Sequence, residues 1–297
     1  MSVVLITGAG TGIGNLTAKT LATAGHHVWA SMRDPNGRDA ARAKDLQDAP
    51  TGAGGSIQVV ELDVLSQDSA NGAVDTVIGE SGRLDVVIHN AGHLFVGYVE
   101  AFTAEEIQGL FDTNVLGVHR LNRAVLPHMR ERRAGTLLYV GSTIPITTPP
   151  FLGPYVASKA AMDSLAVATS YEANAFGIET VIVMPGAFTE GTDHFPNASR
   201  ASDETVSEAY RALDPLLARN AEATASLIPP DVDGSPQSVG DEIARVLALP
   251  FGQKPFRTVV DLTDSGVPDV NEVVTGARHA FVERLGFGEL LQANAEP

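Results

Sequence analysis

A short apolar run near the N-terminus passes directly into a glycine-rich stretch. Val3–Ile6 is β-branched in character, and Thr7-Gly-Ala-Gly-Thr-Gly-Ile-Gly14 follows it at once. A buried strand, a glycine turn and a helix over about residues 15–24 form the first unit of a dinucleotide-binding fold. Glycines let the backbone approach a pyrophosphate, whose charge then lies at the helix N-terminus. The spacing is Gly8-x-x-x-Gly12-x-Gly14 rather than G-x-G-x-x-G. The alternative is a flexible turn that binds nothing.

Strand-like and helix-like segments alternate along the rest of the chain. The further strand-like runs occupy residues 25–34, 57–63, 84–92, 136–140, 180–184 and 257–261. This rhythm predicts an α/β fold with a doubly wound, mainly parallel sheet of seven strands and helices on both faces. One long helical pattern runs from the capping box at Thr103 to about Arg132, with a bend expected at Pro127. Ligands of such sheets lie beyond the carboxyl ends of the strands, where we expect the site.

The end of the second strand carries the residues that distinguish NAD from NADP. An acidic residue there binds the ribose 2′-hydroxyl of NAD, whereas an arginine suits the 2′-phosphate of NADP. Ser31 and Met32 are followed by Arg33 and then by Asp34. Because Arg33 comes first and the uncharged residues before it leave room for a phosphate, we expect NADP(H). NAD(H) remains the alternative, as does a solvated turn in which both charges bind nothing.

A tyrosine and a lysine lie four residues apart in a segment with helical character. Pro154 precedes Tyr155-Val-Ala-Ser-Lys159, and proline fits the first turn of a helix. Positions four apart share one helix face, so the Lys159 ammonium is expected to lower the pKa of the Tyr155 phenol from about 10 toward neutrality. A phenol tuned in this way can act as a general acid or base. The alternative is an accidental pair.

Two further polar residues stand out near the ends of predicted elements. Ser142 follows the strand at 136–140, and an apolar, proline-rich loop at 143–153 separates it from the tyrosine, as expected for the wall of a substrate pocket. Asn114 lies among apolar neighbours, where a buried amide is costly unless it is hydrogen-bonded. An exposed helical asparagine is the alternative for Asn114.

Composition excludes several classes of function. The formal net charge of −16 over 297 residues argues against a nucleic-acid partner and against adhesion to anionic membranes. The chain has no cysteine, so disulfides, thiolate metal sites and a cysteine nucleophile are excluded. No apolar run approaches the length of a membrane span and the N-terminus lacks signal-peptide features, so we expect a cytoplasmic protein. The eight histidines show no close ligand spacing, and no metal site is expected.

The ordered set of motifs resembles the short-chain dehydrogenase/reductase family, in its single-domain branch. The matching pieces cover residue 3 to about 190: Thr7-Gly8…Gly12-Ile13-Gly14, Asp63, Asn90-Ala91-Gly92, Asn114, Ser142, Tyr155…Lys159 and Pro185-Gly186. Two departures are visible. His89 stands where many members have an asparagine, and the threonine that follows the Pro-Gly turn in many relatives is either Thr189 or Thr192.

The resemblance implies a Rossmann-type fold and hydride transfer between a nicotinamide cofactor and a small carbonyl/alcohol substrate. It implies that Tyr155 is the general acid or base, that Lys159 lowers its pKa and holds the ribose hydroxyls, that Ser142 binds the substrate oxygen, and that Asn114 holds a water of a proton relay. The residues that it implies for the cofactor are Gly8, Thr11, Gly12, Ile13, Gly14, Arg33, Asp63, Val64, Asn90, Ala91, Gly92, Tyr155, Lys159, Pro185, Gly186, Phe188 and Thr189.

The last third of the chain is longer than the family's usual end. We expect one NAD(P)-binding domain over 1–297, with a substrate lid at about 188–235 that includes Phe188, Phe195, Tyr210 and Leu213. A surface insertion is the alternative. A helical extension at about 268–297 is expected to pack an apolar stripe on its own domain or on a sister subunit of a homodimer or homotetramer. The stripe consists of Val270, Val274, Ala277, Phe281 and Leu285.

These patterns together predict an NADP(H)-dependent oxidoreductase that interconverts a ketone or aldehyde with an alcohol of moderate, rather apolar size. One alternative is an NAD-dependent alcohol dehydrogenase that works mainly in the oxidative direction. The other, from a different class, is a regulatory protein that senses a nucleotide and uses the fold without turnover.

Overall fold

Seven parallel strands form one sheet in the order β3-β2-β1-β4-β5-β6-β7. This computed structural model describes residues 1–188 and 191–294. The strands are β1 (Val3–Ile6), β2 (His27–Met32), β3 (Ser56–Glu61), β4 (Val86–His89), β5 (Gly135–Val140), β6 (Ile178–Pro185) and β7 (Arg257–Val260). The parallel, seven-stranded, doubly wound sheet predicted from the sequence is confirmed, and the order reverses between β1 and β4, where such sheets bind their ligands.

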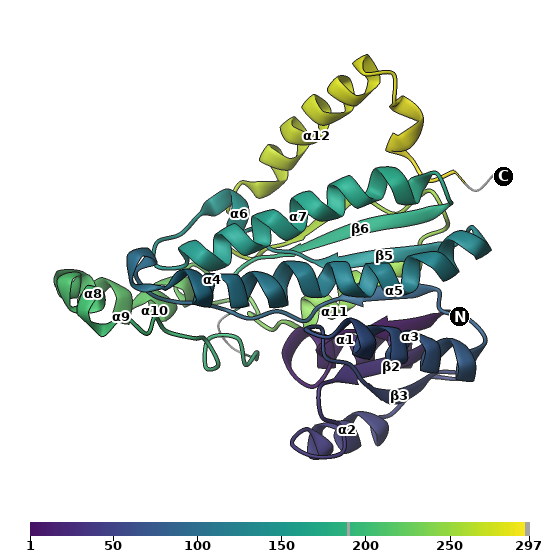
Figure 1. Cartoon of the computed structure of the whole chain (residues 1–297), viewed down its shortest axis with the longest axis horizontal. Helices are drawn as coiled ribbons and strands as arrows, with labels where there is room; N and C mark the ends of the chain where they lie inside the picture. The colour runs from purple at the N-terminus through teal and green to yellow at the C-terminus, as the bar shows by residue number, and fades with distance from the viewer. Residues whose placement is uncertain (189–190, 295–297) are drawn as a thin grey trace.

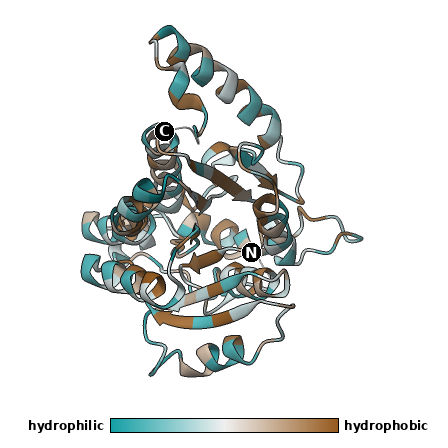
Figure 2. Cartoon of the chain, turned by 90° about the vertical axis from the view of Figure 1, so that its right-hand side faces the viewer, coloured by the Kyte–Doolittle hydropathy of each residue, from teal (hydrophilic) through white to brown (hydrophobic). Residues whose placement is uncertain are grey.

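Helices cover both faces of the sheet (Figure 1). One face packs against α3 (Gln67–Ser81), α5 (Gly117–Arg132) and α7 (Gly153–Asn174), and the other packs against α1 (Gly12–Thr23), α2 (Ala40–Gln47) and α11 (Gln237–Leu247). Successive residues of β1 alternate between the two cores, Val3 and Leu5 to the first, Val4 and Ile6 to the second. Both faces of the central strands are therefore buried, and several strands in the middle of Figure 2 are brown along most of their length. The edge strand β3 has exposed positions.

The long helical pattern at 103–132 contains an irregular turn. Thr103 and Glu106 form the predicted capping box at the start of α4 (Ala104–Phe111). A π-helical turn, η2 (Asp112–Leu116), then joins α4 to α5, and α5 continues through Pro127. The sequence analysis did not anticipate this irregular turn around Asn114. Such π turns re-aim a side chain by inserting one residue into a helix.

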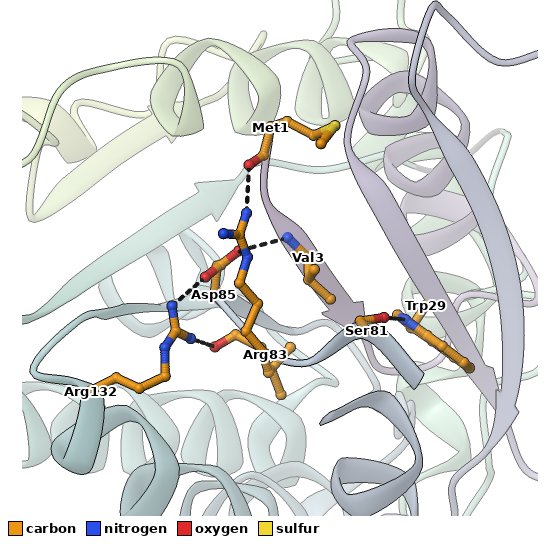
Figure 3. Close-up of polar contacts among 8 residues, drawn as sticks. Met1, Val3, Trp29, Ser81, Arg83, Asp85 and Arg132 are labelled. Carbon is orange, nitrogen blue, oxygen red and sulfur yellow. Dashed lines mark hydrogen bonds and ion pairs between the residues drawn. The ribbon is translucent and has the colours of Figure 1, made fainter. Parts of the chain in front are cut away.

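Asp85, just before β4, links the amino end of β1 to the carboxyl end of α5, at the edge of the sheet opposite the predicted site. Its carboxylate accepts the backbone N–H of Val3 at 2.9 Å and pairs with Arg132 of α5 at 2.8 Å and with Arg83 at 2.9 Å. Figure 3 shows these groups converging, and Arg83 also donating to the carbonyl oxygen of Met1. Nearby, the Trp29 indole N–H bonds to Ser81 across the sheet face.

The segment after β6 is held against the body by two tyrosine–carboxylate pairs. It contains α8 (Glu204–Ala209), η3 (Arg211–Leu213), α9 (Asp214–Ala218) and α10 (Asn220–Ala225), and α8, α9 and α10 gather at one end of the molecule in Figure 1. Tyr98 donates to Asp214 at 2.7 Å, and Tyr210 donates to Glu100 at 2.5 Å. The two tyrosine rings stack with centroids 5.1 Å apart. Tyr98 directly precedes η1 (Val99–Ala101), and Glu100 lies within it.

Helix α12 (Val267–Arg284) projects from the body, with η4 (Gly288–Leu291) after it (Figure 1). Its contacts are made by Val267 and Val282, which are buried, and by Arg278, whose guanidinium lies 4.4 Å from the Phe256 ring centroid. The predicted stripe is not covered within the chain, because Val270, Val274, Phe281 and Leu285 are 40–53% exposed. No helix within 1–188 or 191–294 is long and apolar enough to cross a membrane.

A buried polar group links β4 to α5. The Nε2–H of His89 donates to the Asn122 side-chain oxygen at 2.8 Å, and the Asn122 amide nitrogen donates to the Tyr139 hydroxyl at 3.0 Å. The His89 and Tyr139 rings stack with centroids 4.7 Å apart. Burial lowers the pKa of His89 to about 4, so the folded chain holds a neutral imidazole. This residue stands where many family members have an asparagine.

We predict that His89 makes folding stability fall as the pH drops. The imidazole pKa is 6.5 in its ordinary state and about 4 in the fold, so below about pH 6.5 the unfolded chain takes up a proton that the folded chain refuses. The group contributes nothing to this pH dependence well above pH 6.5. In urea unfolding, the decrease in the free energy of unfolding between about pH 7 and pH 5 should be about 2 kcal/mol smaller in His89→Asn than in the wild type. His128→Asn, at a partly exposed position of α5, is the control. Equal losses in the wild type and in His89→Asn would contradict the prediction.

Candidate active site

The glycine turn brings the start of α1 against the end of β4. Gly8 and Gly12 have φ angles of +64° and +53°, which favour glycine. A Cβ at Gly14 would lie 2.5 Å from the side-chain nitrogen of Asn90, so the helix can approach β4 only without a side chain there. Asn90 donates to the carbonyl oxygens of Thr7 and Gly8 at 2.9 and 3.0 Å. The predicted turn and Asn90 therefore form one unit.

The N-terminus of α1 is suited to an anion. Thr11 occupies the cap position but makes no side-chain cap bond, and the first turn has no acidic residue. Backbone N–H groups at the start of a helix lack partners within that helix, and the helix dipole favours negative charge there. The side chain of Ile13, which was predicted to contact the cofactor, packs against the second core. The pyrophosphate of a dinucleotide fits this chemistry.

Thr7 joins the two central strands, although the sequence analysis did not assign it to the site. Its hydroxyl accepts the backbone N–H groups of Asn90 and Ala91 at 2.9 and 3.0 Å, and it donates to the Ile88 carbonyl oxygen at 3.4 Å. Its position directly before Gly8 was the signal available in the sequence. This bonding fixes the carboxyl ends of β1 and β4 in register, at the point where the strand order reverses.

Asn114 is buried and fully bonded. Its side-chain oxygen accepts the His93 N–H at 2.8 Å, and its amide donates to the His93 carbonyl oxygen at 3.0 Å and to the Ser158 hydroxyl at 2.9 Å. Gly92 lies between this amide and the lysine, because a Cβ on Gly92 would sit 3.4 Å from the Asn114 oxygen and 3.9 Å from the Lys159 nitrogen. The buried interpretation of Asn114 is therefore confirmed over the exposed one.

Tyr155 and Lys159 lie on one face of α7, as the spacing predicts. The Lys159 ammonium is 5.9 Å from the Tyr155 ring centroid and donates to the Val140 carbonyl oxygen at 3.0 Å. Both residues are buried. Burial lowers the pKa of Lys159 to about 8. Burial also raises the pKa of Tyr155 well above its usual range, whereas the sequence predicted a lowered value. The chain alone does not offset the desolvation of the phenol.

The carboxyl ends of β5 and β6 lie beside this pair. Ser142 follows β5, where its hydroxyl accepts the Ile144 N–H at 3.2 Å and donates to the Pro185 carbonyl oxygen at 3.5 Å. Gly186 follows β6, and a Cβ there would lie 2.2 Å from the Asp261 carboxylate beyond β7. The loop after Ser142, predicted as a pocket wall, contains the short helix α6 (Ile144–Thr147).

The end of β2 presents Arg33 and Asp34, both exposed. Asp34 is engaged in its own turn, since its carboxylate accepts the Arg38 N–H at 2.9 Å. Burial is the main cause of the lowered pKa of His93 beyond β4, and the positive charge of Arg33 adds to it. Arg42 of α2 lies beside the glycine turn, 3.5 Å from where a Cβ of Gly10 would be.

Several predicted residues occupy more peripheral positions. Asp63 lies just beyond β3, where its carboxylate accepts the Leu65 N–H at 3.0 Å. Val64 packs against Gly117, whose added Cβ would lie 2.9 Å from the Val64 Cβ. Phe188 is buried in the second core rather than over Tyr155. Thr189 lies outside the described residues. Of the two candidate threonines, Thr192 is described, and it lies 3.5 Å from where a Cβ of Gly12 would be.

Apolar side chains surround the Tyr155 phenol. A third core cluster combines Tyr155 with residues before α4, on α4 and on α7, and Phe195, Ala198, Ala201 and Leu217 of the segment after β6 pack against it. His194 of that segment lies 3.1 Å from the Tyr155 hydroxyl. No pattern in the sequence pointed to His194, which is 39 residues away from the tyrosine. Within 1–188 and 191–294, no group of three or more acidic, histidine or cysteine side chains could hold a metal ion.

Known proteins resemble the chain in sequence over most of its length. Residues 2–203 match the short chain dehydrogenase family. A 3-ketodihydrosphingosine reductase from Bacteroides thetaiotaomicron is 31% identical over 258 residues, which are 87% of each chain. Estradiol 17-beta-dehydrogenase 1 from Rattus norvegicus is 35% identical over 63% of this chain and 54% of its own length.

Solved structures show the same architecture. A short-chain dehydrogenase from Streptomyces avermitilis superposes with a TM-score of 0.73 at 26% identity, over 97% of this chain and 98% of that one. A 3-ketoacyl-(acyl-carrier-protein) reductase from Brucella melitensis, complexed with NADH, superposes with a TM-score of 0.71 at 25% identity, over 89% of this chain and 98% of that one. With its parallel sheet, its glycine turn at α1 and its match over residues 2–203, the chain belongs to the short-chain dehydrogenase family of NAD(P)-dependent oxidoreductases.

Proposed function

We propose that the protein is an NADP(H)-dependent oxidoreductase that interconverts an apolar ketone with its alcohol. The observation that carries this proposal is the Tyr155 hydroxyl, which lies in an apolar cluster while the Lys159 ammonium is buried on the same helix face. An apolar surround accommodates a hydrocarbon substrate, and the phenol is the one group in it suited to exchanging a proton with a carbonyl oxygen.

The proposed roles follow from these positions. The nicotinamide cofactor, when bound, supplies or accepts the hydride. Tyr155 donates its phenolic proton to the carbonyl oxygen during reduction and takes the proton back during oxidation. Lys159, whose pKa of about 8 leaves it mainly protonated at neutral pH, stabilises the resulting tyrosinate through its positive charge. Ser142, beside the ends of β5 and β6, binds the same substrate oxygen.

The substrate class is supported by both the site and the relatives. Phe95, Phe102 and Leu152 belong to the cluster around Tyr155, and Phe195 closes it from the segment after β6. Two of the similar proteins are named for 3-ketodihydrosphingosine and for estradiol, both of which are largely hydrocarbon. We therefore propose a ketone or secondary alcohol attached to a long-chain or ring hydrocarbon, and we propose that residues 188–235 act as its lid.

The preference for NADP(H) rests on the turn after β2. The Asp34 carboxylate already accepts a backbone N–H of its own turn, which leaves it less available to a ribose hydroxyl. Arg33 is exposed, and its positive charge acts on His93 beyond β4. Arg42 lies beside the glycine turn, with its guanidinium 3.6 Å from Asp193. Two guanidinium groups near the adenosine end suit a 2′-phosphate, because such pairs form strong, charge-assisted hydrogen bonds.

We also expect a cytoplasmic homodimer or homotetramer. The chain lacks cysteine, as suits a reducing compartment, and several apolar side chains of α12 are left uncovered within one chain. Sedimentation analysis of the purified protein would measure the oligomeric state directly.

Replacing the phenolic hydroxyl is expected to abolish most of the turnover. Tyr155→Phe keeps the ring in the apolar cluster and removes only the proton donor, so we predict a decrease of about 10²- to 10⁴-fold in kcat/KM for ketone reduction with NADPH. The rate is followed through NADPH absorbance with cyclohexanone, a long-chain ketone and estrone. Tyr171→Phe, at a partly exposed position of the same helix, should retain full activity. A nucleotide sensor would instead bind NADPH and reduce none of these ketones, and the two tyrosine variants would then behave alike.

Cofactor preference is expected to depend on Arg33. A hydrogen bond to a charged group contributes about 1.5–3 kcal/mol, so Arg33→Ala should raise the KM for NADPH by roughly 10- to 100-fold and leave the KM for NADH nearly unchanged. Arg38→Ala, which removes a mainly exposed arginine 3.6 Å from Asp39, is the matched control in the same turn. An unchanged ratio of the two KM values in Arg33→Ala would contradict the assignment and favour NAD(H).

A further inference from the structure

A histidine from the segment after β6 touches the hydroxyl of the central tyrosine. The Nε2 atom of His194 lies 3.1 Å from the Tyr155 oxygen, within hydrogen-bonding distance. The two rings meet edge to face, with centroids 5.5 Å apart and planes at 67°. His194 thus approaches the one atom of the phenol that takes part in proton transfer, while Lys159 lies 5.9 Å from the ring centroid.

The segment that carries His194 is fixed to the body on both sides of this contact. On one side Thr192 packs on Gly12 of the glycine turn, as its 3.5 Å approach to an added Cβ there shows. On the other side Ser199 bonds through its backbone to Leu94 and Val96 at 2.9 and 3.0 Å. Phe195, next to the histidine, packs into the apolar cluster that contains the tyrosine. The position of the imidazole is therefore set by several independent contacts.

We propose that His194 is a positioning residue that donates its Nε2–H to the Tyr155 oxygen and so stabilises the tyrosinate formed during turnover. A phenol oxygen can accept a hydrogen bond while its own O–H points elsewhere. When Tyr155 gives its proton to a substrate oxygen, its O–H bond breaks and the phenolate keeps the electron pair. A donor already in place then bonds more strongly to that charged oxygen. The inference rests on the proposed acid–base role of Tyr155.

The surroundings of His194 favour a neutral imidazole that keeps one N–H. Burial, then the positive charge of Lys159 and that of His93, lowers the pKa of His194 to about 4. Asp193 lies next to it in the chain, but Arg42 of α2 is only 3.6 Å from that carboxylate and opposes its charge. The imidazole is thus neutral at the pH of catalysis, and it can donate a hydrogen bond without adding a second positive charge beside the lysine.

The contact with His194 counteracts the effect of burial on the pKa of Tyr155. Burial raises the pKa of Tyr155, and Lys159 directs one of its protons to the Val140 carbonyl oxygen. A hydrogen bond from His194 acts in the opposite direction, because a donor to the charged form lowers the pKa of the phenol. The segment after β6 would in this way contribute to proton transfer as well as covering the substrate.

Nitrogen-15 NMR of the histidine side chains in the full-length protein tests the contact without any turnover. The His194 signals are assigned by their loss in His194→Gln. We expect a protonated Nε2 whose chemical shift changes in Tyr155→Phe. An unprotonated Nε2 in the wild type, or a shift unaffected by Tyr155→Phe, would overturn the proposal, because the histidine would then accept from the phenol or lie away from it.

The pH dependence of alcohol oxidation tests the consequence, with NADP⁺ and cyclohexanol, a long-chain secondary alcohol or estradiol. The rate should rise with pH as the tyrosinate forms, and His194→Phe should move this rise upward by about 1–2 pH units. His194→Gln, which keeps an N–H at a similar distance, should restore most of the wild-type profile. Asn197→Ala, at an exposed position of the same segment, is the control and should match the wild type.

The outcomes separate this inference from the proposed function. The proposal fails if the oxidation rate of His194→Phe rises at the same pH as that of the wild type. A lower KM for the alcohol in this variant would then mean that the histidine merely occupies the substrate's position. If the wild type oxidises none of the alcohols and reduces none of the ketones, the proposed function fails, while the NMR measurement still decides whether His194 donates to Tyr155.

Discussion

The arrangement of the site depends on a buried amide that has to be hydrogen-bonded. Asn114 is removed from water, and leaving such a group unpaired costs about 1–3 kcal/mol. The π-helical turn between α4 and α5 aims its side chain at both backbone groups of His93 and at the Ser158 hydroxyl. The amide thereby ties the end of β4 to α7, the helix that carries Tyr155. A regular helix through 103–132 would shift this side chain to another face.

Burial creates the chemical problem that the site has to solve. A tyrosine among apolar side chains is well placed to meet a hydrocarbon substrate, but the same surroundings oppose the tyrosinate, and they also disfavour the charge of Lys159. Desolvation therefore opposes catalysis in two ways. It disfavours the tyrosinate directly, and it disfavours the positive charge of the lysine that would stabilise the tyrosinate. Additional donors at the phenol oxygen are therefore valuable, and His194 is the one that the described part of the chain provides.

Much of this protein was determined by its sequence alone. The seven strands, their mainly parallel direction, the helices on both faces, the capping box at Thr103 and the family could all be predicted, because they follow from local hydrophobic periodicity and from motifs of adjacent residues. The order of the strands in the sheet was not predicted. Tyr155 and Lys159 are four residues apart on one helix, so their common face required no knowledge of the fold. Asn90 and the glycine turn were also expected at one edge of the sheet, since both follow strands directly. Their contact depends on the pairing of β1 with β4, which was not predicted.

Tertiary structure decided what depends on burial and on distant segments. The direction of the Tyr155 pKa shift was predicted wrongly, because the sequence showed the nearby lysine but not the loss of water around the phenol. The π-helical turn at Asn114 was not predicted, since it serves contacts made outside the helix. The stripe on α12 was expected to pack on its own domain or on a sister subunit, and within one chain most of it stays exposed, because periodicity shows which residues share a face but not what packs there. His194 meets Tyr155 only because the chain folds back after β6, and no local pattern records such a contact.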